Sequence, residues 1–163
     1  MAWLRVFNER GKYQDDSALM DVLNYCTRAD KSNSDLIGGW AVNPENAREE
    51  METLTKLINK DTGCRLRHFE ISFSPERHIE PEIVAQISKE CSKYYGHDHQ
   101  ILYAVHTDKE HSHAHFVMNT VRYTDGKKYR GTKQDLYRFE KHCTNVLHKF
   151  NLKESVNFVH GDK

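Results

Sequence analysis

The sequence lacks the features by which secreted, disulfide-stabilised and membrane-spanning proteins are recognised. Its four cysteines are scattered and form no C-x-x-C pair, and its N-terminus does not resemble a signal peptide. No apolar run approaches the roughly 20 residues that a membrane span needs. Net charge is absent too: 24 basic side chains balance 24 acidic ones, so bulk electrostatics favour neither nucleic acid nor membrane as a partner. We therefore expect free thiols in a cytoplasmic protein without a membrane segment.

Histidine and a basic C-terminal quarter stand out against this background. Eleven of the 163 residues are histidine, and residues 121–163 carry ten Lys or Arg against five Asp or Glu. This local excess of positive charge could still face phosphate. Hydrophobic residues make up 37% of the chain, which is enough for one modest core, so we expect a single domain over residues 1–163.

Hydrophobic periodicity and capping signals predict alternating strands and helices. We expect strands at Ala2–Phe7, Leu66–Ser74, Ile101–His106, His113–Tyr123 and Val156–His160. We expect a helix of about ten residues that is capped within Asp15–Ser17 and ends near Arg28, and further helices at Asn43–Lys60, Pro81–Tyr95 and Thr132–Phe150. A long loop is expected at Ala29–Val42. This order predicts an α+β fold, in which helices pack on the faces of an antiparallel central sheet.

Two of the predicted strands bring three histidines together. If Asp108–His111 closes a symmetric hairpin, His106 lies opposite His113, and His115 joins the same face two residues along. The register divides the other residues of the hairpin: Asp108, His111, Val117 and Asn119 share the histidine face, and Tyr103, Val105, Ala114, Phe116 and Met118 form the core face.

Three imidazoles on one face favour a divalent metal site over three unrelated surface histidines. Opposed and next-but-one positions are about 5 and 7 Å apart, so one cation is within reach of all three rings. Three neutral nitrogen ligands leave coordination positions open, as in catalytic sites. His111 is expected at the hairpin tip, where a side chain is more exposed to solvent, so it is left out of the predicted ligand set.

The spacing His106-x-Asp108-x₄-His113-x-His115-x-Val117-x-Asn119 resembles the metal motif of the relaxase, or mobilisation nuclease, family. That family belongs to the HUH endonuclease group, named for paired histidines flanking a hydrophobic residue. The segment Tyr25–Lys31 is similar to the family's tyrosine motif, and the segment His68–Glu76 is similar to its intermediate strand motif. Together the motifs resemble those of MOB-P conjugative relaxases. The resemblance covers residues 19–123 and implies the N-terminal nuclease domain, or a fragment, of a longer protein.

The resemblance also implies an activity. Tyr25 would attack a DNA phosphodiester, form a 5′-phosphotyrosine intermediate and allow the reverse, rejoining reaction. The expected substrate is single-stranded or hairpin DNA at the transfer origin of a plasmid or integrative conjugative element, with accessory relaxosome proteins as partners. The expected cofactor is a divalent cation held by His106, His113 and His115, first Mn²⁺ or Mg²⁺, with Zn²⁺, Ni²⁺ or Co²⁺ as alternatives.

Further residues are assigned to the site from charge and position. Asp108 could accept a hydrogen bond from His106 or take the tyrosine proton, or it could be an ordinary solvated turn residue. Glu70 and His68 are left without a role. The predicted DNA contacts are Arg28, Lys31, Asn119, Lys127, Lys128 and Arg130.

Two other functions remain open from the sequence. A rolling-circle replication initiator would normally use a tyrosine downstream of the histidine motif, and Tyr94 and Tyr137 are candidates. A non-catalytic nucleic-acid-binding module would instead use the histidines to hold structural zinc, with a closed fourth ligand.

Overall fold

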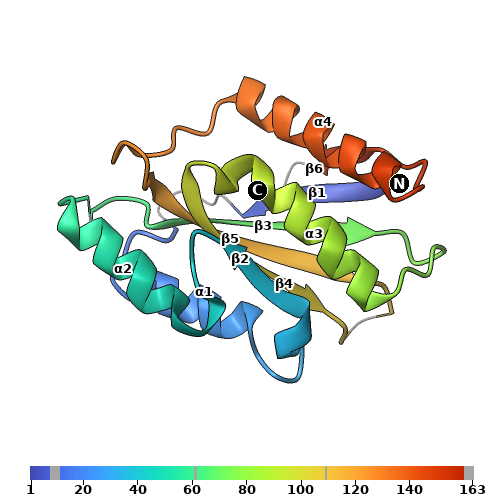
Figure 1. The fold of residues 1–163 in the computed structure, drawn as a ribbon, viewed down its shortest axis with the longest axis horizontal. Helices are drawn as coiled ribbons and strands as arrows, with labels where there is room; N and C mark the ends of the chain where they lie inside the picture. The colour runs from blue at the N-terminus through green and yellow to red at the C-terminus, as the bar shows by residue number, and fades with distance from the viewer. Residues whose placement is uncertain (8–11, 61, 109, 160–163) are drawn as a thin grey trace.

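The protein folds around a six-stranded sheet with two helices on each face (Figure 1). This computed structural model describes residues 1–7, 12–60, 62–108 and 110–159. The elements are β1 (Ala2–Phe7), α1 (Ala18–Cys26), β2 (Ile37–Trp40), α2 (Ala47–Leu57), β3 (Leu66–Phe73), α3 (Pro81–Gly96), β4 (His99–His106), β5 (His113–Arg122), α4 (Lys133–Lys149) and β6 (Val156–Val159), with short 3-10 turns at Ser34–Leu36 and Pro44–Asn46.

The strand order β2-β4-β5-β3-β1-β6 places β5 in the interior of the sheet. Four of the five strand pairs are antiparallel, as expected, but β6 runs parallel to β1. The predicted α+β class with an antiparallel central sheet is therefore confirmed, and the parallel pair lies at one edge of the sheet. A parallel neighbour needs a long connection between the two strands, and α4 lies in the connection that leads to β6.

The predicted loop Ala29–Val42 was wrong at its end, because Ile37–Trp40 forms edge strand β2 against β4. The Gly38-Gly39 pair suggested a loop, since glycine is depleted in strands. Here the missing side chain is what allows the pairing. A Cβ on Gly38 would lie 2.2 Å from the Tyr103 hydroxyl oxygen, so the Tyr103 ring packs where that side chain would be.

The two faces of the sheet carry separate cores. Helices α3 and α4 cover the face that bears the residues predicted as the core of the hairpin: Tyr103, Val105, Ala114, Phe116 and Met118. Helices α1 and α2 cover the other face, where they pack on Leu102, Ala104 and Val117. All four cysteines are free thiols, as the sequence suggested. Among the described residues, no helix is long and apolar enough to cross a membrane.

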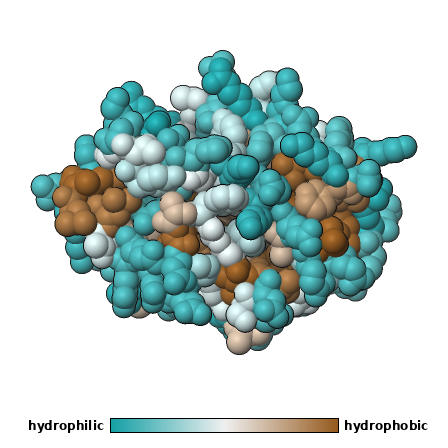
Figure 2. All heavy atoms as spheres, viewed as in Figure 1, coloured by the Kyte–Doolittle hydropathy of each residue, from teal (hydrophilic) through white to brown (hydrophobic). Residues whose placement is uncertain are grey.

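Figure 2 shows a mostly hydrophilic face with separate apolar patches, one of them where α2 ends. At that end Leu57 is 76% exposed.

Candidate metal centre and adjacent tyrosine

The hairpin register brings the three predicted histidines to one place beneath α1. His106 pairs with His113 across β4 and β5, and His115 follows two residues along on the same face. All three side chains are buried, and one nitrogen of each lies within 4.8 Å of the others. The hairpin geometry predicted from the sequence is thus present in the structure. His111 belongs to neither of the two groups of potential metal ligands found among the described residues.

One hydrogen bond and one contact with a carboxylate indicate which ring nitrogen carries a lone pair in two of these histidines, His106 and His115. His106 Nε2 lies 2.8 Å from the carbonyl oxygen of Cys26, which can only accept, so Nε2 carries the proton. His115 Nε2 lies 3.2 Å from a carboxylate oxygen of Glu70, which fixes its proton in the same way. The lone pair of each ring is then on Nδ1. Ligating histidines in proteins are oriented by the same kind of contact, so this donor set fits a divalent cation.

The sequence interpretation missed the part that His68 plays in this site. His68 lies on β3, and its Nε2 is 2.8 Å from His115 Nδ1, while its Nδ1 is 3.1 Å from the Tyr13 hydroxyl. The Phe7 ring stacks on it with the ring centres 4.3 Å apart. Burial, with smaller contributions from Lys12 and His106, lowers the pKa of His68 to about 3, so the ring is a neutral imidazole at physiological pH.

Tyr25 lies at the rim of the histidine cluster, on the last turn of α1. Its ring meets His106 and His115 edge-on, with ring centres 5.9 and 5.7 Å apart, and the residue is 41% exposed. It lines a cavity of about 620 Å³ together with His68, Glu70 and His115. The same cavity is also lined by cations and aromatic rings that the sequence did not single out: Arg5, Phe7, Lys12 and Tyr13.

Asp108 has a different partner from the one considered from the sequence. Its carboxylate accepts a hydrogen bond of 2.9 Å from Lys31 Nζ, whereas His106 Nε2 donates to the Cys26 carbonyl. This contact is the main reason that the pKa of Asp108 is lowered and that of Lys31 is raised. Lys31 Nζ also lies 5.1 Å from the centre of the Tyr25 ring. Asp108 therefore holds a cation beside the tyrosine.

Several of the predicted DNA contacts lie elsewhere. Asn119 is fully buried, and its side-chain amide donates hydrogen bonds to Gln100 Oε1 and to the Met51 carbonyl oxygen. The prediction that Asn119 contacts DNA was therefore wrong. Residues 127–130 follow the far end of β5, and six residues at about 3.3 Å each put Val121 roughly 20 Å from His115. Lys127, Lys128 and Arg130 are consequently remote from the histidines. Lys31 lies beside Tyr25, and Arg28 belongs to the same segment after α1.

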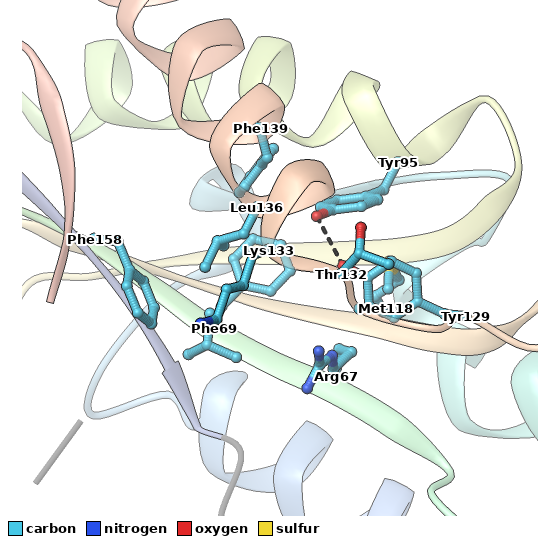
Figure 3. A pocket seen from close by; sticks show the side chains of 12 residues that line it. Arg67, Phe69, Tyr95, Met118, Tyr129, Thr132, Lys133, Leu136, Phe139 and Phe158 are labelled. Carbon is cyan, nitrogen blue, oxygen red and sulfur yellow. Dashed lines mark hydrogen bonds between the residues drawn. The ribbon is translucent and has the colours of Figure 1, made fainter. Parts of the chain in front are cut away.

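The downstream tyrosines lie on the helices of the opposite face. Tyr94 on α3 donates to an oxygen of Asp135, as do Tyr95 and Tyr129, and Tyr137 is exposed on α4. Beside this network is a cavity of about 260 Å³. Figure 3 shows Phe158 on one side of it, and Tyr95 and Tyr129 on the other. Neither Tyr94 nor Tyr137 shares a face of the sheet with the histidines.

Comparison with known proteins places this arrangement in a family. Residues 25–152 match the family model for relaxases described as the MobA/VirD2-like nuclease domain. A Staphylococcus aureus protein named rlx is 27% identical over 130 residues, covering 80% of this chain and 40% of that protein. The group II intron-interrupted relaxase LtrB of Lactococcus lactis subsp. cremoris is 27% identical over 73 residues, which are 44% of this chain and 13% of LtrB.

A solved structure shares the fold. It was described under the heading "Molecular Basis of Vancomycin Resistance Transfer in Staphylococcus aureus" and superposes with a TM-score of 0.55 at 15% identity, over 78% of this chain and 75% of that one. The chain thus spans only two fifths of the rlx protein named above, while the family model covers most of the chain. On these grounds the chain belongs to the MobA/VirD2-like relaxase family, within its nuclease domain.

Proposed function

We propose that this domain nicks and rejoins one strand of DNA at a specific site in a transfer origin, with Tyr25 as the nucleophile. The observation that carries the proposal is the position of Tyr25, a half-exposed tyrosine whose ring meets two of the three clustered histidines edge-on. The relaxase relatives favour conjugative mobilisation as the setting and accessory relaxosome proteins as partners.

The reaction exchanges one phosphodiester for another. The Tyr25 phenolic oxygen attacks the phosphorus, the bond to the 3′ oxygen breaks, and the protein is left joined to the 5′ phosphate. The half-exposed Tyr25 gives its proton to solvent as it attacks, and the departing 3′ oxygen takes up a proton and leaves as a 3′ hydroxyl, so the proton count is unchanged. Because its pKa is lowered, Asp108 is a weaker base than an ordinary aspartate, so we assign it the task of holding Lys31 above the Tyr25 ring. The ammonium of Lys31 then offsets the negative charge that develops on the attacking oxygen.

A divalent cation held by His106, His113 and His115 would polarise a non-bridging phosphate oxygen and make the phosphorus more electrophilic. Mn²⁺ and Mg²⁺ are our first candidates, although three imidazoles also suit Zn²⁺, Ni²⁺ and Co²⁺. Glu70 positions the ring of His115 through its Nε2 hydrogen, and the Cys26 carbonyl does the same for His106.

The shape of the cleft favours single-stranded DNA. A scissile phosphate must reach three buried histidines, and the cavity beside Tyr25 combines Arg5 and Lys12 with the rings of Phe7 and Tyr13. Cations that follow a backbone and aromatic rings on which bases stack are the usual means of binding single strands. We therefore propose Arg5 and Lys12, with Lys31 and Arg28, as the backbone contacts.

A covalent-adduct assay tests the proposal. Single-stranded oligonucleotides that tile the transfer origin of the encoding element are incubated with protein and Mn²⁺ and then separated under denaturing conditions. We expect one oligonucleotide to give a protein adduct, which is lost in EDTA, in Tyr25→Phe and in His113→Ala. Tyr137→Phe, which changes an exposed tyrosine on the opposite face, is the matched control and keeps the adduct. An adduct of normal yield with Tyr25→Phe would refute the assignment of the nucleophile.

A further inference from the structure

A second set of metal-ligand side chains adjoins the three-histidine cluster and shares one member with it. Cys26, His68 and His115 each offer one donor atom, and the three atoms lie within 4.8 Å of one another. The Cys26 sulfur is 3.8 Å from His68 Nε2, which in turn is 2.8 Å from His115 Nδ1. The three side chains come from α1, β3 and β5, and all are buried.

These distances are close to those of a tetrahedral zinc site. Ligands at about 2.3 Å for sulfur and 2.1 Å for nitrogen lie roughly 3.6 Å apart, and two nitrogens roughly 3.4 Å apart. The Cys26 to His68 separation is therefore already suitable, and the two imidazoles need to move apart by only about half an ångström. The cavity lined by His68 and His115 gives an ion a path to the site from solvent.

The hydrogen-bond partners of His68 suit a ligand role. Its Nδ1 faces the Tyr13 hydroxyl, a group that can either donate or accept. The ring can thus move its proton from Nε2 to Nδ1 without losing that hydrogen bond. The lone pair on Nε2 is then directed between Cys26 and His115.

We propose that Cys26, His68 and His115 form a second metal site, which takes a thiophilic divalent cation such as Zn²⁺. On binding, the Cys26 thiol gives its proton to solvent and a sulfur–metal bond forms, while the two imidazoles donate lone pairs. His115 Nδ1 has one lone pair, so an ion held here removes His115 from the three-histidine set. The two sites are mutually exclusive, and thiophilic metals select the one that contains sulfur.

Cobalt absorption spectroscopy on the full chain separates the two sites. Co²⁺ bound through a thiolate gives a sulfur-to-cobalt charge-transfer band, and Co²⁺ bound only by imidazoles does not. We expect the band in the unmodified protein and in His113→Ala, which alters only the three-histidine set, and we expect its loss in Cys26→Ser and His68→Gln. Cys64→Ser is the matched cysteine control, because the Cys64 thiol donates to a backbone carbonyl away from the cluster, and it should keep the band.

X-ray absorption of the zinc-loaded unmodified protein identifies the atoms that bind the metal without the need for a substitution. We expect one sulfur scatterer at about 2.3 Å from the metal. Zinc bound by nitrogen and oxygen atoms alone, or a cobalt charge-transfer band that persists in Cys26→Ser, would overturn the proposal. Both experiments omit DNA. Failure of the covalent-adduct assay therefore leaves this inference standing, and absence of the sulfur leaves the proposed DNA chemistry standing.

Discussion

The ammonium nitrogen of Lys31 lies 5.1 Å from the centre of the Tyr25 ring, and Asp108 holds it there through a contact of 2.9 Å. Lys31 lies in the polar segment after α1 and Asp108 follows β4, so the pair ties two distant parts of the chain together beside the proposed nucleophile. A fixed cation at this place can act on the oxygen of Tyr25 and on an approaching phosphate.

Replacement of Lys31 tests this role. Lys31→Met removes the charge and keeps most of the side-chain stem, so we expect the single-turnover cleavage rate to fall by about tenfold, through lost stabilisation of the attacking oxygen. The Mn²⁺ concentration that gives half-maximal rate should not change. Arg28→Met is the control for lost attraction of DNA, because Arg28 is a proposed backbone contact in the same segment but forms an exposed pair with Asp30. Equal losses of cleavage rate in both variants would mean that these two side chains only attract DNA, and that Lys31 has no specific action on Tyr25.

Glu70 provides a prediction about metal affinity. Its carboxylate orients His115 through Nε2, and loss of such outer contacts typically weakens metal binding by about 10–100-fold. We therefore expect Glu70→Gln to raise the dissociation constant for Mn²⁺ by that factor in calorimetry. The exposed Glu76 lies on the turn after the same strand, and Glu76→Gln should bind as the unmodified protein does. Unchanged affinity in Glu70→Gln would show that His115 needs no carboxylate to hold its orientation.

The tyrosine network on the opposite face predicts a loss of stability in alkali. Burial, followed by the hydrogen bond to Asp135, raises the pKa of Tyr129 from 10.0 to about 12, and burial also raises the pKa values of Tyr94 and Tyr95. The folded state thus holds protons that the unfolded chain releases. The stability contributed by Tyr129 is fully present below about pH 10 and is lost as pH rises through about 12.

Urea unfolding at a series of pH values measures this effect. We expect the free energy of unfolding to fall steadily between about pH 10 and 12, and to fall less steeply in Tyr129→Phe, which has no proton to release. Tyr137→Phe changes an exposed hydroxyl and should keep the slope of the unmodified protein. The same slope in all three proteins would contradict the assignment to Tyr129.

The sequence predicted the hairpin well because two independent patterns agreed there. Alternation assigned each residue to a face, and the short connection fixed the opposition of His106 and His113, which the structure contains. The environment of His115 could not be obtained in the same way. Alternation places Glu70 on one face of β3, but only long-range pairing of β3 with β5 puts it opposite His115.

Asn119 illustrates the opposite limitation. Its face was predicted correctly, yet a face of a sheet does not say which helix covers it. Helix α2 lies over this part of β5, and the Met51 carbonyl accepts a hydrogen bond from the Asn119 amide. Strand β2 was missed for a related reason. Glycine suits a strand at position 38 because the ring of Tyr103, from the neighbouring strand, fills the space that a side chain would occupy. Both errors come from contacts between residues far apart in the chain.

The most direct test of the account is to identify the residue that becomes joined to DNA. The adduct formed with a cleaved oligonucleotide is digested with nuclease and protease, and the peptide that retains a 5′ nucleotide is sequenced by mass spectrometry. We predict that the modified residue is Tyr25, beside His106 and His115. A nucleotide on Tyr94, Tyr137 or any other residue would contradict the central claim.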